Sequence, residues 1–206
     1  MIKKLLGLFA IGSIAAAQPK LPDAKLDIGH IYPYVVPSAY FQATSAKAMA
    51  VTWPLGHGLY VALVQDLDGA VRNILPEDLD ALGLSAEEVK KKAIENLEAL
   101  AKSGAIGQQR FAGPDQKPFV LFGGHWAAAA CILLPGLHQM GVKNVGSEEL
   151  CVCIPHREAL LMFAKADVRY RDLMRAMIRE RESDGRKPLT FDLFELTAKG
   201  LTELKE

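Results

Sequence analysis

Four side chains in the middle of the chain could bind a ligand or carry a proton, and each follows an apolar run: His125, His156, Arg157 and Glu158. An imidazole changes charge near neutral pH, so each histidine could donate or accept a proton. A guanidinium can hold a carboxylate or phosphate through two parallel hydrogen bonds. The four residues therefore predict a site for a small anionic ligand. The alternative is that the histidines cap helices at the surface and Arg157 pairs with Glu158 or another acid.

The three cysteines offer a second kind of chemistry. Cys151 and Cys153 are two residues apart in an apolar run, so on a strand their side chains point to the same face. With His156 they give the spacing Cys-x-Cys-x-x-His, which suits a soft metal such as copper(I) or zinc. In an exported protein Cys131 could instead form a disulfide with one of them. Their apolar neighbours favour a third interpretation, in which all three are buried free thiols.

Motifs for the common catalytic and cofactor sites are absent from the sequence. It contains no Gly-x-Ser-x-Gly elbow, no His-Glu-x-x-His zinc motif and no Gly-x-x-x-x-Gly-Lys phosphate loop. Gly123-Gly124 lacks the third glycine of a dinucleotide fingerprint. Asp66 and Asp68 flank a turn glycine, but the other ligands of a calcium loop are missing. We therefore predict neither a cofactor nor a bound metal.

A strand–helix–strand unit is predicted to position the four polar residues. Phe119–Phe122 has the apolar, aromatic composition of a buried strand, and Leu150–Ile154 is a second such run. Between them, His125–Met140 is alanine-rich and long enough for about four helical turns. A further helix is expected over His156–Ala164, starting at Pro155. Such a unit normally makes a right-handed crossover between parallel strands, which would place both strand ends and both helix N-termini at one sheet edge.

The first half of the chain predicts a small antiparallel sheet and two helices. Prolines interrupt His30–Pro37, which is typical of an edge strand. A short helix should begin at Pro76, and a longer one should follow the capping box of Ser85 and Glu88 and end near Gly104. Three further strands are expected between turn residues: Ala48–Pro54, Leu59–Gln65 and Ala70–Leu75.

The C-terminal segment predicts one more helix and one more strand. Asp167–Glu182 is charged, with apolar residues on one face, as in a surface helix. Leu189–Leu196 has the composition of a strand and residues after Gly200 are expected to fray, while Arg110–Pro118 is expected to be a loop. Elements in this order indicate an α+β fold, in which a mixed β-sheet carries packed helices and includes one strand–helix–strand crossover.

Composition is that of an ordinary globular protein. Half of the 206 residues are hydrophobic and 23% are charged, so a core can form without disulfide or metal staples. The 24 basic and 24 acidic residues cancel. Because the chain has no net positive charge, neither nucleic acid nor an anionic membrane surface is expected as a partner. We expect residues 18–206 to form a single domain.

Residues 1–17 have the pattern of a cleavable secretory signal peptide. Lys3 and Lys4 precede the apolar stretch Leu5–Ala15, and small residues stand before Gln18. The apolar stretch is shorter than the roughly 20 residues of a membrane span, which argues against an uncleaved anchor, and no cysteine follows it to carry a lipid. We expect an exported bacterial protein, secreted or periplasmic, without a transmembrane segment after removal of the leader.

Several short segments stand in an order known from a bacterial protein family: Ile31-Tyr32-Pro33, Tyr60–Leu63, Ala93–Leu97, Leu150–Phe163 and Leu189–Phe194. The chain thereby resembles the YtpQ-like proteins, known as domain of unknown function 1444. The resemblance implies no biochemistry, because the activity of that family is not established. Two features depart from it. Ala128–Ala130 replaces a polar Asp-Ala-Ser step of the family. This chain also begins with a secretory leader, whereas the familiar members look cytoplasmic.

Two classes of function remain open from the sequence. The first is a non-catalytic envelope or periplasmic protein that binds a partner protein or a small ligand, and the absence of a catalytic motif favours it. The second is a hydrolase-like enzyme that uses the four polar residues at the carboxyl edge of the central strands. A pocket that gathers all four would favour the enzyme, whereas an apolar groove without them would favour the binding protein.

Overall fold

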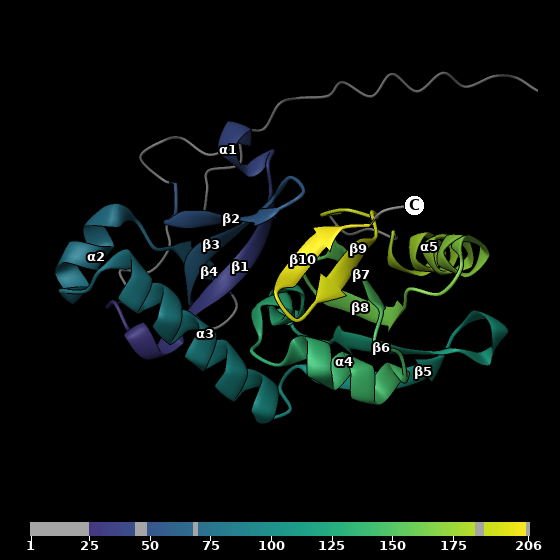
Figure 1. Cartoon of the computed structure of the whole chain (residues 1–206). Coiled ribbons are helices and arrows are strands. Elements are labelled where there is room, and N and C mark those ends of the chain that lie inside the picture. Colours follow the sequence, from purple (N-terminus) through teal and green to yellow (C-terminus); the bar gives the residue numbers. More distant parts are fainter. Residues whose placement is uncertain (1–24, 44–48, 68–69, 184–187, 205–206) are drawn as a thin grey trace, which may run out of the picture.

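The chain folds into two antiparallel β-sheets with helices packed on them, so the predicted α+β class is confirmed (Figure 1). The computed structural model describes residues 25–43, 49–67, 70–183 and 188–204. The proposed leader, residues 1–17, lies outside these ranges. The predicted mixed sheet is wrong, because every strand pair among the described residues is antiparallel.

The smaller sheet is built around one central strand. β3 pairs with β1 along one side, and with β2 and β4 along the other. β1 is therefore an edge strand, as its prolines predict. The tight turn between β2 and β3 places Gly56, His57 and Gly58 at positive φ. The bounds are β1 (Ile31–Pro37), β2 (Thr52–Gly56), β3 (Leu59–Asp66) and β4 (Val71–Asn73), and β1 lies between the short helices η1 (Ile28–His30) and α1 (Tyr40–Ala43).

Helices α2 (Pro76–Leu82) and α3 (Ala86–Lys102) follow as predicted. The capping box is present: Ser85 Oγ accepts a hydrogen bond from the Glu88 N–H at 3.3 Å, and Glu88 Oε2 accepts one from the Ser85 N–H at 2.8 Å. Asn96 donates to the carbonyl oxygens of Ile28 and Ile31 at 2.8 and 2.9 Å. These two bonds fix α3 against η1 and the start of β1.

The larger sheet contains six strands in the order β10-β9-β7-β8-β6-β5. Two predictions for this part of the chain are wrong. β5 takes up residues of the predicted loop at Arg110–Pro118, and a strand forms after Gly200 where fraying was expected. The bounds are β5 (Gly107–Ala112), β6 (Pro118–Gly123), β7 (Leu150–His156), β8 (Ala159–Ala164), β9 (Phe194–Thr197) and β10 (Gly200–Glu203).

The predicted strand–helix–strand unit is present in an altered form. β6 and β7 run in the same direction, but β8 lies between them and pairs antiparallel with both, so the predicted parallel neighbours are wrong. Two short helices, η4 (Ala128–Leu133) and α4 (Leu137–Val145), replace the single helix expected over His125–Met140. Gly136 separates them with a φ of +76°, a left-handed conformation that glycine adopts at little cost.

The helix predicted over His156–Ala164 is also wrong, because this segment is the turn into β8 and β8 itself. Leu160 and Met162 belong to the apolar cluster on one face of the sheet, while Leu161 and Phe163 belong to the cluster on the other. A strand covered on both faces has a continuous apolar run, so composition alone does not separate it from a buried helix.

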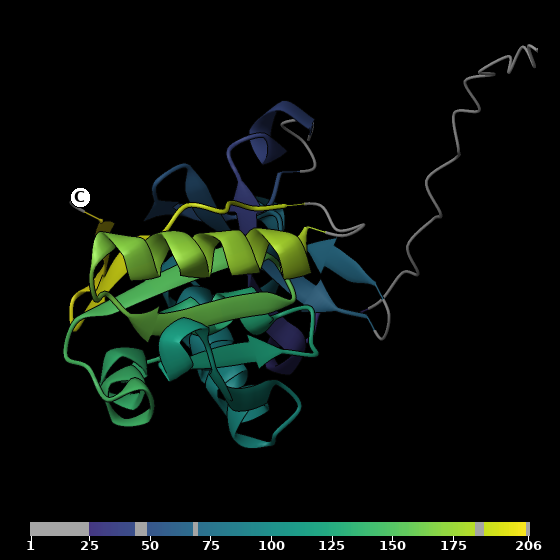
Figure 2. The ribbon, with the colours of Figure 1, turned by 90° about the vertical axis from the view of Figure 1, so that its right-hand side faces the viewer.

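Helices cover both faces of the larger sheet (Figure 2). η4 and α4 pack on one face, and α5 (Val168–Glu182) packs on the other, starting where Asp167 Oδ1 accepts a hydrogen bond from the Tyr170 N–H at 2.8 Å. The first of these cores also includes Val35 and Leu59, so it continues into the smaller sheet. Within the described ranges, no helix combines the length and hydrophobicity needed to cross a membrane.

Candidate functional site

His156, one of the four predicted site residues, is buried in contact with α5. It is 2% exposed, and its Nε2 lies 2.7 Å from Oε2 of Glu182 at the end of α5. The Glu158 N–H donates to His156 Nδ1 at 3.2 Å. Because Nδ1 accepts, the ring carries its proton on Nε2 and donates it to Glu182. His156 therefore ties the end of β7 to α5.

Arg157 and His125 lie instead beside a group of aromatic rings. The Arg157 guanidinium sits 4.7 Å from the centre of the Tyr34 ring, and its buried Nε has no hydrogen-bond partner among the described residues. The His125 ring is 5.3 Å from that of Trp126. Burial lowers the pKa of His125, and the charge of Asp66 opposes this shift.

The structure thus divides the four predicted residues rather than gathering them in one pocket. Glu158 is exposed in the β7–β8 turn next to Arg157. The helix start expected at Pro155-His156 does not exist, because both residues belong to β7. The unpaired backbone N–H groups that a helix end would have offered to an anion are therefore absent at this turn. The ligand-binding role of the four residues stays a prediction.

The three cysteines are buried free thiols. Cys151 and Cys153 share one face of β7, as predicted, and pack toward α5, whereas Cys131 packs in the core on the opposite face. Burial raises the pKa to about 12 for Cys131, about 11 for Cys151 and about 12 for Cys153. At neutral pH they are therefore protonated, which suits neither a nucleophile nor a metal ligand. The described residues contain no cluster of three or more His, Cys, Asp and Glu that could hold a metal ion.

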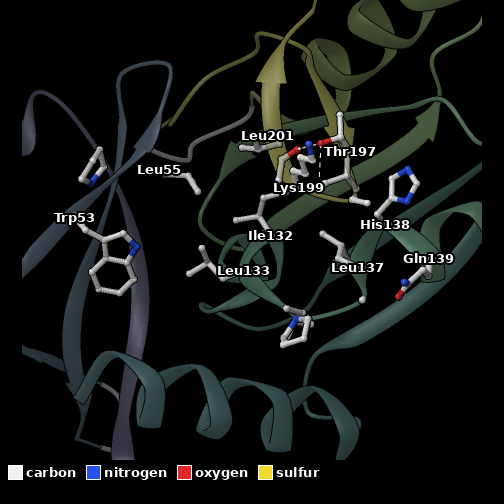
Figure 3. A pocket seen from close by; sticks show the side chains of 17 residues that line it. Trp53, Leu55, Ile132, Leu133, Leu137, His138, Gln139, Thr197, Lys199 and Leu201 are labelled. Atoms are coloured by element: carbon white, nitrogen blue, oxygen red, sulfur yellow. Dashed lines mark hydrogen bonds between the residues drawn. The ribbon is translucent and has the colours of Figure 1, made fainter. Parts of the chain in front are cut away.

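A groove of about 480 Å³ opens where the two sheets meet (Figure 3). This volume lies in the range of sites for small molecules. Its walls come from three parts of the chain: β2, the segment that joins η4 to α4, and the β9–β10 hairpin. The connection between η4 and α4 turns sharply at Pro135-Gly136, and this turn gives the groove one of its walls.

Aliphatic side chains from all three walls line the groove. In Figure 3, Leu55 of β2 and Leu133 of η4 extend toward the same space as Leu137 of α4 and Leu201 of β10. Leu55, Leu133 and Leu201 are each only partly buried. They pack against the same core but keep part of their surface exposed, so the groove leaves apolar surface open to a ligand.

The ionisable residues in the lining are basic. They are Lys199 in the β9–β10 turn and His138 in the first turn of α4, and the lining residues that the structure describes include no aspartate, glutamate, cysteine or serine. Thr197 Oγ1 accepts a hydrogen bond from the Lys199 N–H at 3.1 Å and donates to the Gly200 carbonyl at 2.9 Å, so its hydroxyl is occupied in fixing the turn. Lys199 forms no ion pair with a described residue. The lining thus offers positive charge without a nucleophile and its base.

The sequence prediction did not include any of these groove residues. Leu133 and Leu137 fall inside the single helix predicted over His125–Met140, and a helical pattern would place both side chains in the core. The available signal was Pro135-Gly136, a pair that marks turns and argues against a continuous helix. No local pattern indicates that the β9–β10 hairpin faces this turn, since that proximity follows from the strand order of the larger sheet.

The chain is distantly similar to one curated protein of an uncharacterised family. The UPF0354 protein lin1649 of Listeria innocua serovar 6a is 27% identical over 171 residues. The similarity covers 82% of this chain and 61% of the relative, so the chain spans less than two thirds of that protein's length. No family model matches the chain, and no solved structure matches it. This chain is therefore distantly similar to a protein of an uncharacterised family.

Proposed function

We propose that this chain is a non-catalytic binding protein whose ligand is a small amphipathic anion held in the groove between the two sheets. The described lining of the groove supports this function best: partly exposed aliphatic side chains stand beside Lys199 and His138, without an acidic residue. An apolar chain would contact Leu55, Leu133 and Leu201. A carboxylate would lie near Lys199, where charge complementarity selects anions over cations.

The hydrolase alternative has less support from the same geometry. It requires a nucleophile with an adjacent base, or the four predicted polar residues around one substrate. His156 instead donates to Glu182 in a buried contact, and the groove lining includes none of the four residues. The buried, protonated cysteines supply no thiolate.

Titration calorimetry with three ligands of equal chain length tests this function. Octanoate is expected to bind more tightly than 1-octanol, and octylammonium is expected to bind weakest. Leu133→Gln should weaken octanoate and octanol together, by about tenfold, because a buried apolar contact is worth about 1–3 kcal/mol. Lys199→Gln should weaken octanoate alone, by roughly threefold to fivefold, as expected for an exposed charge pair.

Two matched variants serve as controls for this experiment. Leu173→Gln changes a leucine of α5 that is 37% exposed, and Lys143→Gln removes an exposed lysine of α4, both outside the groove lining. Neither control should alter binding. Equal affinity for octanoate and octylammonium, or equal losses in the groove variants and the controls, would contradict the proposal.

We also propose that the protein is exported and that it is related to the YtpQ-like family. The basic, apolar and small-residue pattern of residues 1–17 supports export, and the distant UPF0354 relative supports an uncharacterised family. Intact-mass analysis of protein recovered from the periplasm or medium is expected to show a chain that begins at Gln18. Full-length protein that retains Met1 and stays in the cytoplasm would show that the export prediction is wrong.

A further inference from the structure

A second hollow, of about 360 Å³, lies beside β1 and shares no lining residue with the groove. Tyr34 of β1 and Trp126, which follows β6, supply its aromatic walls. Asp66, the last residue of β3, adds a carboxylate, and Ala70 and Val71 are the other described lining residues. We refer to these five residues as the aromatic pocket.

The two aromatic walls are held at an angle to each other. The ring centres of Tyr34 and Trp126 are 5.8 Å apart and the ring planes differ by 58°. Tyr32, two residues before Tyr34 on the same face of β1, meets Trp126 edge-on, with ring centres 5.8 Å apart and planes at 86°. Trp126 is therefore packed against two tyrosines of one strand. The electron-rich faces of such rings attract cations, most strongly in the case of tryptophan.

Among the described lining residues of the aromatic pocket, Asp66 and Tyr34 are the ionisable ones. Burial raises the pKa of Tyr34 above its usual value, an effect that the charge of Arg157 opposes, so the phenol stays neutral at physiological pH. Burial raises the pKa of Tyr32 and the Asp66 carboxylate adds to that shift, while the same carboxylate opposes the lowering of the pKa of His125 by burial. Asp66 is thus the residue whose charge a ligand of this pocket would meet.

The Tyr34 ring already receives one cation from the protein itself. The Arg157 guanidinium lies 4.7 Å from its centre, outside the pocket lining. Trp126 has no such contact with a described lysine or arginine. The indole therefore remains the stronger of the two walls for a cation that enters the pocket.

We propose that the aromatic pocket binds an organic cation with apolar substituents, such as a quaternary ammonium group. The alkyl groups would contact Trp126, Tyr34 and the side chains of Ala70 and Val71, and Asp66 would balance the positive charge. Such a group is large and weakly hydrated, so it loses little solvation on entering a mostly apolar hollow, whereas a small hydrated metal ion would find a single carboxylate among the lining residues that the structure describes. The charge preference is opposite to that of the groove.

Choline and its neutral isostere, 3,3-dimethyl-1-butanol, separate charge from shape in a direct test. The chain has two tryptophans, so Trp53→Phe leaves Trp126 as the only indole, and its fluorescence reports binding. Choline is expected to give a saturable change with an affinity at least about tenfold above that of dimethylbutanol. Asp66→Asn should remove most of this difference, whereas Asp80→Asn, which changes an exposed aspartate of α2, should keep it.

A second pair of variants makes the test independent of Asp66. By calorimetry, Trp126→Phe should retain choline binding in part, because an aromatic face remains, and Trp126→Leu should abolish it. Equal affinity of choline and dimethylbutanol would overturn the proposal, as would loss of choline binding in Asp80→Asn. An absence of saturable binding at millimolar choline would also overturn the proposal. These outcomes do not bear on octanoate in the groove, because the two sites share no residue.

Discussion

Met162→Ala is expected to lower the free energy of unfolding by about 2–5 kcal/mol, because it removes a fully buried side chain from the centre of the larger sheet. Met162 lies on β8 and reaches Gly141 of α4. A Cβ atom added at Gly141 would be 2.5 Å from the Met162 Sδ and 2.5 Å from Leu150 Cδ1. The absence of a side chain at Gly141 therefore allows α4 to pack closely on the sheet.

This proximity predicts that changes at the two positions partly compensate. Gly141→Ala alone should cost about 1–3 kcal/mol through overpacking, since the fully buried Met162 and Leu150 side chains must shift to admit the new methyl group. In the double variant, the new methyl group occupies space that Met162→Ala vacates. Urea unfolding of the wild type, the two single variants and the double variant measures this. The double variant is expected to lose less free energy of unfolding than the sum of the two single losses, by at least about 0.5 kcal/mol. Strict additivity would contradict this packing.

His156→Ala is expected to cost about 3 kcal/mol of stability, because it leaves a cavity and removes the partner of a charged hydrogen bond. The side chain is 2% exposed and its Nε2 is 2.7 Å from Glu182. Glu182→Gln should cost less, since an amide oxygen can still accept the proton of Nε2. Thermal unfolding, followed by circular dichroism, measures both effects.

Glu180→Gln is the matched control, because Glu180 is an exposed glutamate of the same helix, two residues earlier. It should change stability by less than about 0.5 kcal/mol. If His156→Ala were as stable as the wild-type protein, the contact with α5 would not hold the fold. His156 would then return as a candidate for binding or catalysis.

The sequence predicts elements well where the signal is local. The capping box of Ser85 and Glu88 marks the start of α3, and prolines mark β1 as an edge strand, because both effects act within a few residues. The prediction was wrong for β8, whose apolar run is buried on both faces. A run of this kind does not distinguish strand from helix.

The two proposed binding sites were less predictable than the fold class, for a related reason. His125, Arg157 and His156 are close in the predicted crossover, but the insertion of β8 turns His156 toward α5 and leaves Arg157 beside Tyr34. Trp126 and Tyr34 are distant in the sequence, and they meet only because β1 packs beside the segment after β6. Such proximities depend on strand order and not on local pattern.

The position of β8 also has a consequence for the order in which the chain can assemble. β8 follows β7 after a two-residue turn, so this hairpin closes a short loop, whereas its pairing with β6 joins residues as far apart as Phe119 and Phe163. Because short loops cost less entropy to close, the hairpin is expected to form first and then dock onto β6. Until it docks, the apolar edge Phe119–Phe122 is open to strands of other chains. The interval before β8 docks is therefore expected to be the step at which the folding chain is most exposed to aggregation.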